Sequence, residues 1–459
     1  MRKLFTLAAL AAIVLMVAPA QAQLTPMEQL GKFLYFDTNL STPSGQSCAS
    51  CHLPEAGFAD PDQGLPVSEG IIPTRFGNRN APGAAYAAFS PLFGWNEAEG
   101  LYMGGQFWDG RAADLTEQAK GPFLNPLEMN MPNKKSVVKT VSKSDYANLF
   151  LDVYGPGAFD DVELAYHNIA AAIAAFESSS EVNPFSSKYD LYLAGEVELT
   201  PQEQFGLEVY EGKAMCNLCH PSEGAGALFT DYSYDNLGVP RNPNNPFYGL
   251  PPHFNPDGEN FVDLGLGGFL NDPAEMGKVK VPTLRNIALT APYMHNGFFG
   301  NLRDVVRFYS TRDVDPTWPP PEYADNVNVD ELGNLGLTDE EIDAVVAFMM
   351  TLTDGYQPMM AKAVPGEQAP PVKVATLSAA PNPFNPATTV RFELPYAGAV
   401  RITAYDVAGR LVGTLLNEPN HPAGFHQVTW TAEGLASGSY FLRLHGPGTD
   451  LVQKVTLVK

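Results

Sequence analysis

Cysteine and histidine recur in this chain in one arrangement, Cys-x-x-Cys-His, at residues 48–52 and again at residues 216–220. At this spacing two thiols can add to the two vinyl groups of a haem, and the adjoining imidazole can bind its iron. A zinc site, a thioredoxin-like redox pair and structural disulfides are the alternatives. The immediate histidine in both copies favours two covalently bound c-type haems. Their predicted attachment residues are Cys48, Cys51, His52, Cys216, Cys219 and His220, which include every cysteine of the chain.

A repeated segment precedes each motif and predicts the helix that positions it. The pattern Leu-Thr-Pro-x-Glu-Gln-x-Gly begins at Leu24 and recurs at Leu199. In each copy the threonine can cap a helix, the proline suits the first helical position, and the glutamate lies three residues after the cap. We therefore expect two units in tandem, each a helix followed by a haem motif. Further helices are predicted over 162–178 and 338–352, and a loop over 58–105.

Length and charge restrict the partners and the number of domains. A chain of 459 residues suggests two or three domains. It carries 28 Lys and Arg against 51 Asp and Glu, with 22 against 46 in residues 1–375 and six against five in residues 376–459. The acidic field would repel nucleic acids and anionic lipid surfaces, so neither is expected as a partner. It would attract a basic protein to the haem-binding part of the chain.

The first 22 residues are typical of a secretory signal peptide. A short basic start at Arg2 and Lys3 is followed by an apolar run over residues 4–17 and by small residues that fit a cleavage site. The apolar run is shorter than the roughly 20 residues that a membrane-spanning helix needs. We therefore predict that the protein is exported, to the periplasm, the cell surface or the medium.

The C-terminal part of the chain differs in character from the rest. Residues 357–375 are rich in Pro, Ala and Val and predict a linker. Beyond them, short alternating segments separated by turn residues predict a β-sandwich over 376–459. The strands are predicted at residues 388–394, 400–406, 411–417, 424–431, 438–444 and 452–458.

This tail contains Pro-Asn-Pro-Phe-Asn-Pro at 381–386, Tyr-Asp-x-x-Gly-Arg at 405–410 and Gly-x-Tyr-x-x-Arg-Leu at 438–444. It resembles the immunoglobulin-like C-terminal sorting domain of type IX secretion cargo. The resemblance implies handling by an outer-membrane export machine. A passive spacer or adhesive sandwich is the alternative, and neither interpretation places a catalytic site in the tail.

The segments between and after the haem motifs carry a second resemblance, which covers residues 24–353. They resemble the bacterial di-haem cytochrome c peroxidases and the related MauG-type enzymes. The motifs that carry it are Gln-Phe-Trp-Asp-Gly-Arg at 106–111, Gln-Ala-Lys-Gly-Pro at 118–122, Leu-Glu-Met at 127–129, Val-Pro-Thr-Leu-Arg-Asn at 281–286 and Ala-Pro-Tyr-Met-His-Asn-Gly at 291–297.

The resemblance implies a mainly helical, loop-rich fold of two tandem cytochrome c-like haem domains, with the β-sandwich after them. The N-terminal domain, predicted at 23–195, would hold the peroxidatic haem. The C-terminal domain, predicted at 196–356, would hold the haem that handles electrons.

The resemblance also assigns roles to single residues. His52 and His220 correspond to the proximal iron ligands, and Trp108 to the aromatic residue between the haems. Glu128 corresponds to a distal-pocket carboxylate, and Gln118 to a further distal position. The residue types fit these roles, because a poorly solvated carboxylate can take the proton of a peroxide and return it to the leaving oxygen.

Two departures bear on the subclass. Family peroxidases carry a histidine after the first haem motif that caps the resting iron, whereas residues 53–79 contain none. The second departure is Tyr309, which stands where those peroxidases have Met and MauG-type enzymes have Tyr. It falls on the same helical face as Leu302, and its phenolate could ligate the second iron and stabilise its oxidised states. Met294 is the alternative ligand.

Members of the family hold a calcium ion between the haem halves. The corresponding residues here are Asn80, through its side chain, and Thr290 and Pro292, through their carbonyl groups. Hard oxygen ligands of this kind suit Ca²⁺. The resemblance therefore implies one calcium ion in addition to two haems.

From these features we expect an exported di-haem c-type peroxidase that reduces hydrogen peroxide to water. The electron donor would be a small, basic redox protein such as a cytochrome c. The alternatives are a MauG-type oxidase that modifies a protein or organic substrate, and a surface electron-transfer cytochrome without catalytic activity. The sequence also leaves open a homodimer.

Overall fold

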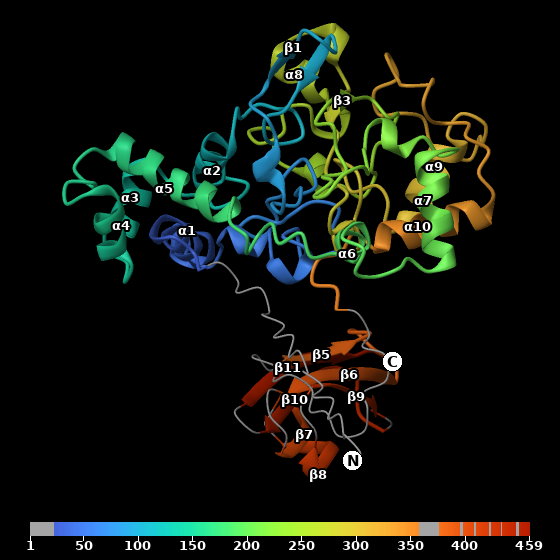
Figure 1. Ribbon diagram of the computed structural model, residues 1–459. Helices are drawn as coiled ribbons and strands as arrows, with labels where there is room; N and C mark the ends of the chain where they lie inside the picture. The colour runs from blue at the N-terminus through green and yellow to red at the C-terminus, as the bar shows by residue number, and fades with distance from the viewer. Residues whose placement is uncertain are drawn as a thin grey trace, which may run out of the picture. The chain divides into compact units, whose positions relative to one another are not determined.

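The computed structural model describes residues 23–357 and 376–459, except 395–397, 408–409, 422–423, 433 and 447–448. The predicted signal peptide and all but the first residue of the predicted linker lie outside the described residues. The chain divides into two compact units, Met1–Pro358 and Met359–Lys459, which are taken separately below (Figure 1). Among the described residues, no helix is long and apolar enough to cross a membrane.

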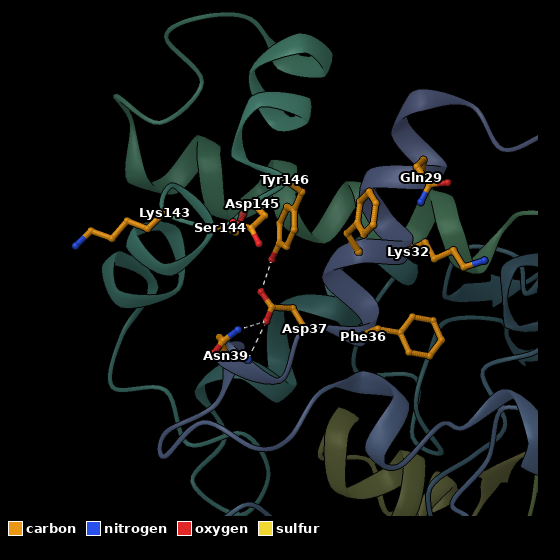
Figure 2. A pocket seen from close by; sticks show the side chains of 10 residues that line it. Gln29, Lys32, Phe36, Asp37, Asn39, Lys143, Ser144, Asp145 and Tyr146 are labelled. Atoms are coloured by element: carbon orange, nitrogen blue, oxygen red, sulfur yellow. Dashed lines mark hydrogen bonds between the residues drawn. The ribbon is translucent and has the colours of Figure 1, made fainter. Parts of the chain in front are cut away.

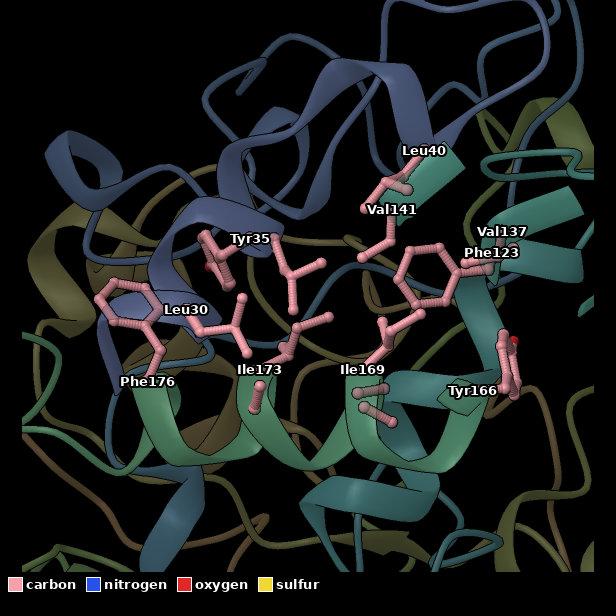
Figure 3. Close-up of a cluster of buried hydrophobic side chains, with 14 of the residues drawn as sticks. Leu30, Tyr35, Leu40, Phe123, Val137, Val141, Tyr166, Ile169, Ile173 and Phe176 are labelled. Atoms are coloured by element: carbon pink, nitrogen blue, oxygen red, sulfur yellow. The ribbon is translucent and has the colours of Figure 1, made fainter. Parts of the chain in front are cut away.

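The first half of the larger unit is built on two crossing helices, α1 (Pro26–Phe36) and α5 (Val162–Glu177). They approach closely because Gly31 has no side chain: a Cβ atom there would lie 1.9 Å from the Ala172 carbonyl oxygen. Helices α2 (Leu115–Leu124), α3 (Lys134–Val141) and α4 (Ala147–Tyr154) complete this half. Their apolar side chains meet those of α1 and α5 in one buried cluster (Figure 3).

The second half repeats this construction. Helix α7 (Pro201–Glu211) packs against α10 (Asp339–Met350), and a Cβ atom at Gly206 would lie 1.9 Å from the Ala344 carbonyl oxygen. A second buried cluster lies around these helices and α9 (Leu302–Thr311). The short helices α6 (Lys188–Leu193) and α8 (Gly265–Leu270) complete the helical elements of this half.

The predicted helix starts are confirmed. Thr25, Thr200 and Thr338 cap α1, α7 and α10, and each receives a hydrogen bond from the backbone N–H of the glutamate three residues later. Each glutamate carboxylate in turn accepts the threonine backbone N–H. The reciprocal pair satisfies donors that a helix start otherwise leaves unpaired, which is why this short pattern sets the helix boundary.

Loops and short strands connect the helices. The segment predicted as loop over 58–105 does contain a short hairpin, β1 (Gly94–Asn96) paired with β2 (Leu101–Met103). A second small pair joins β3 (Tyr234–Asp235) to β4 (Val279–Lys280). The hairpin was missed because its strands are only three residues long and the surrounding composition is that of a loop.

The smaller unit is a sandwich of two antiparallel sheets, as predicted. One sheet has the order β11-β10-β7-β8 and the other β5-β6-β9. Inward side chains of both sheets, such as Val390 and Leu442, form the core between them. The strands are β5 (Thr376–Ala380), β6 (Ala387–Leu394), β7 (Gly398–Asp406), β8 (Leu411–His421), β9 (Gly424–Thr431), β10 (Gly438–Gly446) and β11 (Thr449–Leu457). Strand β5 was not among the predicted strands, because its Ala-rich sequence continues the composition of the linker.

Candidate active site

Both Cys-x-x-Cys-His motifs line one cavity in the larger unit. In each motif the first cysteine begins a single 3-10 turn, Cys48–Ser50 or Cys216–Leu218, and the histidine follows the turn. The backbone N–H groups of His52 and His220 close the turns on the carbonyls of Cys48 and Cys216, both at 2.9 Å. The tight turn brings the two cysteines and the histidine of one motif to the same cavity wall.

The helix before each motif holds the histidine backbone. The Tyr35 hydroxyl, on α1, donates a hydrogen bond of 2.7 Å to the carbonyl of His52. The Tyr210 hydroxyl, on α7, does the same to the carbonyl of His220, also at 2.7 Å. Both tyrosines are fully buried. The repeated helices therefore position the predicted iron ligands through equivalent contacts.

The imidazoles themselves are in the form that binds iron. Their Nδ1 atoms are 3.3 Å from the Phe58 carbonyl oxygen for His52 and 2.7 Å from the Phe229 carbonyl oxygen for His220. Burial lowers the pKa of both histidines, so the neutral ring is favoured near neutral pH. A neutral imidazole held through one nitrogen can offer the other to a metal.

The cysteines fit attachment of a haem better than the alternatives. None of the four forms a disulfide. Burial raises the pKa of Cys51, Cys216 and Cys219 to about 12, which disfavours the free thiolate that a thioredoxin-like redox pair requires. Within the described ranges, no group of three or more His, Cys, Asp or Glu side chains could hold a metal ion.

The cavity wall also presents polar atoms that lack a partner. Among the described residues these include Gln46 Oε1, Glu177 Oε2, Tyr232 OH and His295 Nδ1, all buried. Buried polar atoms normally have hydrogen-bond partners. A haem with its propionates and ordered water would supply such partners, so these residues and the motifs together fit two haems.

Glu128 lies on the same cavity wall as the first motif. It follows α2, is half-buried, and accepts a hydrogen bond of 2.7 Å at Oε1 from Asn125 Nδ2. Burial raises the pKa of its carboxyl group, and the hydrogen bond from Asn125 and the charge of Arg111 offset part of that rise. Its charge also contributes to the raised pKa of Cys48, which places the carboxylate near the first motif. Gln118, on α2, lines the cavity as well.

Trp108 lies on the cavity wall with residues of both motifs. Its Nε1 atom donates a hydrogen bond of 2.8 Å to the Asn80 carbonyl oxygen, and its own carbonyl accepts one of 2.8 Å from the Lys280 backbone. The ring is 6.5 Å from that of His295, centroid to centroid. Contacts with both halves of the unit therefore fix the indole.

The structure brings the two candidate ligands of the second iron together and does not choose between them. Tyr309, on α9, points its hydroxyl at the Met294 sulfur, 3.9 Å away, and both residues line the cavity. Burial, followed by the charges of Cys216 and Cys219, raises the pKa of Tyr309. Met294 has a φ of 73°, a left-handed conformation that is costly for methionine and is often found at functional sites.

The three residues predicted to bind calcium also line this cavity. Asn80 is 8% exposed, its Nδ2 donates to the Pro66 carbonyl at 3.2 Å, and its backbone N–H donates to the His295 carbonyl at 2.7 Å. Thr290 and Pro292 precede His295 in the same segment. Calcium binding here stays a prediction.

Comparison with known proteins agrees with this geometry. Residues 25–198 match the family model for di-haem cytochrome c peroxidases, and residues 378–458 match the model of a secretion-system C-terminal sorting domain. The methylamine utilization protein MauG of Paracoccus denitrificans is 41% identical over 355 residues, which are 72% of this chain and 89% of that protein. The cytochrome c551 peroxidase of Pseudomonas aeruginosa is 30% identical over 331 residues, 72% of this chain and 79% of that protein.

Among solved structures, the diheme peroxidase BthA of Burkholderia thailandensis matches with a TM-score of 0.65 and 34% identity, over 72% of this chain and 87% of that chain. The chain belongs to the di-haem cytochrome c peroxidase family. It carries a C-terminal sorting domain in addition. Membership of the family implies two c-type haems, and it includes both peroxidases and MauG proteins.

One buried ion-pair group of this family member was not identified from the sequence. Arg79, from the first half, binds Asp109 at 2.6 Å and Asp263, from the second half, at 2.6 Å. Burial alone would raise the pKa of Asp263, but the Arg79 guanidinium lowers it well below its usual range. Asp109 directly follows Trp108, so this group ties the segment that carries the indole to both halves. Only Asp109 stood in a recognised motif; no local pattern indicates its partners.

A separate hollow on the surface of the first half has no predicted site residue on its wall (Figure 2). Phe36 borders it from α1, and Tyr146 donates a hydrogen bond from its hydroxyl to Asp37. Lys32 and Lys143 lie at its edge in Figure 2. No cysteine or histidine is among the residues that line the hollow, so the candidate active site of this di-haem protein is the cavity of the two motifs.

Proposed function

We propose that this protein is an exported di-haem peroxidase that reduces hydrogen peroxide to water with electrons from a small, basic redox protein. The observation that carries the proposal is the Glu128 carboxylate, which lines the cavity beside the first haem motif and has a pKa raised by burial. A carboxylate in such a position can exchange protons with a bound peroxide near neutral pH.

Reduction of one peroxide molecule consumes two electrons and two protons and yields two water molecules. The haems, when bound, supply iron at which the O–O bond breaks and a path for the electrons. Glu128 takes the proton from the entering peroxide and returns it to the departing oxygen. Asn125 Nδ2 orients the carboxylate through Oε1, and the Gln118 amide offers a further hydrogen-bonding group on the same wall.

The second half would deliver the electrons. Trp108 shares the cavity with both motifs, and its hydrogen bond to Asn80 and the ion pairs of the adjacent Asp109 hold the indole in place. A fixed aromatic ring between two haems would shorten the step that an electron must make. The excess of 46 acidic over 22 basic residues before residue 376 supports a basic donor protein, guided to this part of the chain at low salt.

Export and calcium belong to the same proposal. The sorting domain and the predicted signal peptide support export, with the haem-binding unit in the periplasm, at the cell surface or outside the cell. A calcium ion held by the Asn80 side chain and the carbonyl groups of Thr290 and Pro292 would join segments of both halves. Removal of calcium with a chelator would then reduce electron transfer between the haems.

The test is to mix the holoprotein with hydrogen peroxide and a reduced, small, basic c-type cytochrome. We expect two cytochrome molecules to be oxidised for each peroxide consumed, at a rate that falls as salt is added. Consumption of peroxide without oxidation of the cytochrome would contradict the proposed donor. A protein whose haem spectrum does not respond to peroxide would be an electron carrier instead.

A second candidate, a MauG-type oxidase, rests on Tyr309, whose side chain lines the haem cavity. Phenolate ligation would stabilise oxidised iron, and the similar Paracoccus protein is a MauG. If Tyr309 is the ligand, Tyr309→Phe will change the low-spin haem spectrum and Met294→Leu will not; the reverse result would assign the methionine. Oxidation of an added protein or organic substrate by peroxide, without a cytochrome, would support the oxidase.

The spectrum of the protein as isolated tests a related point. Because residues 53–79 contain no histidine, we expect the iron bound by His52 to have no internal sixth ligand. One high-spin and one low-spin haem would agree with this expectation. Two six-coordinate low-spin haems would refute it.

A further inference from the structure

The two halves differ at one buried position that no predicted role explains. A Cβ atom added at Gly31 would also lie 2.9 Å from Phe176 Cβ, on α5. A Cβ atom added at Gly206 would lie 2.9 Å from Phe348, on α10, again measured to its Cβ atom. Phe176 and Phe348 are therefore equivalent. The residues that follow them are Glu177 in the first half and Met349 in the second, and both line the haem cavity.

Glu177 is an unusual residue for this place. It is 6% exposed, and its Oε2 atom has no hydrogen-bond partner. It is the last residue of α5, where the helix dipole disfavours a negative charge. Burial raises the pKa of its carboxyl group to about 8. The equivalent Met349 shows that the fold accepts an apolar side chain at this position, so packing alone does not require the acid.

Among the described residues, no positive side chain offsets the burial that raises the pKa of Glu177. Its charge contributes to the raised pKa of Tyr35, on α1, and of Cys48, in the first haem motif. The charge of Cys51, in the same motif, also contributes to the raised pKa of Tyr35 and of Cys48. Tyr35 is occupied by its hydrogen bond to the His52 carbonyl, and the two thiols lose their acidity once they attach the haem. The haem held by Cys48 and Cys51 would then bring a variable charge into the cavity that Glu177 and Glu128 both line.

We propose that Glu177 is the proton-binding site of the first haem. When this haem gains an electron from the donor, the Glu177 carboxylate takes up one proton from solvent, and when the electron leaves, that proton returns to solvent. The charge of the pocket then changes less than it would by electron transfer alone, which lowers the electrostatic cost in a poorly solvated site. The inference rests on haem binding at the first motif and not on the peroxide reaction, so either proposal can fail alone.

The test is a spectroelectrochemical titration of the holoprotein, from about pH 6 to about pH 9, with EPR to assign each potential to a haem. In the wild type we expect the reduction equilibrium constant of the first haem to fall as pH rises past the Glu177 pKa of about 8. Full coupling gives a tenfold change for each pH unit, which is 59 mV for one electron. The second haem, beside Met349, is followed in the same titration, and its potential should not respond to substitution of Glu177.

Glu177→Gln keeps the shape of the side chain without its charge. Glu177→Met introduces the residue type that the second half has at the equivalent position, Met349. In both variants the potential of the first haem should match the wild type at the acid end and lie above it at the alkaline end. Glu181→Gln, which removes a partly exposed carboxylate of the same half, should leave the wild-type pH dependence intact. The same pH dependence in Glu177→Gln and in the wild type would overturn the proposal, whatever the peroxidase activity of the variants.

Discussion

The two halves of the haem-binding unit share a scaffold and differ in the groups that face the cavity. Gly31 and Gly206 make the same helix contact, and Tyr35 and Tyr210 hold the histidine backbones at the same distance of 2.7 Å. These shared features lie on the repeated helices. They show that one construction is used twice to hold a Cys-x-x-Cys-His motif.

The differences lie in the segments that follow the motifs. In the first half, the cavity wall includes Glu128 and Glu177, and burial raises the pKa of both. In the second half it includes Tyr309 and Met349, together with Asp235, whose pKa is also raised by burial. Buried acids therefore line the cavity in both halves, whereas the first half has a glutamate where the second has a methionine, and a candidate iron-binding phenol lies in the second half. The comparison teaches that the repeat builds the two motif sites and that the chemical groups around each motif differ.

The largest expected effect comes from removing the attachment cysteines of one half at a time. The variant Cys48→Ser with Cys51→Ser should contain only the second haem and lose the reaction with peroxide. The variant Cys216→Ser with Cys219→Ser should contain only the first haem, respond to peroxide, and no longer oxidise a cytochrome. Mass spectrometry and haem content per chain measure the first outcome, and absorption spectra after mixing measure the second. Equal behaviour of the two variants would remove the division of roles.

Glu128→Gln tests the acid–base group of the first half. The amide cannot accept the proton of peroxide, so we expect the peroxide-dependent rate to fall by about 10²- to 10⁴-fold while haem content stays the same. The control is Glu117→Gln, an exposed residue of α2 paired with Lys120. Because burial raises the pKa of Glu128, the wild-type rate should also fall as pH drops through that pKa. An unchanged rate in Glu128→Gln would exclude the carboxylate from the reaction.

Gly31→Ala and Gly206→Ala test whether the two halves rest on the same contact. Each new Cβ atom would lie 1.9 Å from a backbone oxygen, so the helices must separate. We expect each variant to lower the free energy of unfolding by about 3 kcal/mol, measured by denaturant titration. The control is Gly300→Ala, where an added Cβ atom meets nothing within 4 Å. A large effect in one half alone would show that the scaffolds are not equivalent in energy.

The smallest expected effect is a pH-dependent gain in stability from Glu177→Gln. The folded-state pKa of about 8 is above the ordinary value of 4.5, so the folded protein holds a proton that the unfolded chain releases between these values. Wild-type stability should therefore be highest near pH 5 and decline as pH rises toward 8. The glutamine variant should lack this decline and should be more stable than the wild type at the alkaline end. Parallel stability curves would contradict the buried-acid description.

Much of the fold could be predicted because its signals are local. The Thr-x-x-Glu boxes that start α1, α7 and α10 use contacts within four residues, and the alternating strands of the tail predicted its sandwich. Elements without a strong local signal were missed. The three-residue strands β1 and β2 lie within the predicted loop, and β5 directly follows the predicted linker.

The candidate site divides in the same way. Attachment of haem was predictable from the spacing within each motif, and a resemblance indicated Glu128, Trp108 and Tyr309. Arg79 gave no signal, because its partners Asp109 and Asp263 are brought to it by the packing of distant segments. Glu177 gave no signal in the sequence either. The structure shows that it ends α5 and lines the cavity.

By itself, the sequence predicted the attachment of haem, and it determined the starts of the repeated helices and the acidic charge of the haem-binding part. These depend on residues close together in the chain or on composition, so they need no tertiary contact. Only the tertiary structure decided that both motifs share one cavity, that Tyr309 meets Met294, and that the Glu177 Oε2 atom is buried without a hydrogen-bond partner. Burial and long-range contact set the pKa values and the neighbours of these groups, and no local pattern contains that information.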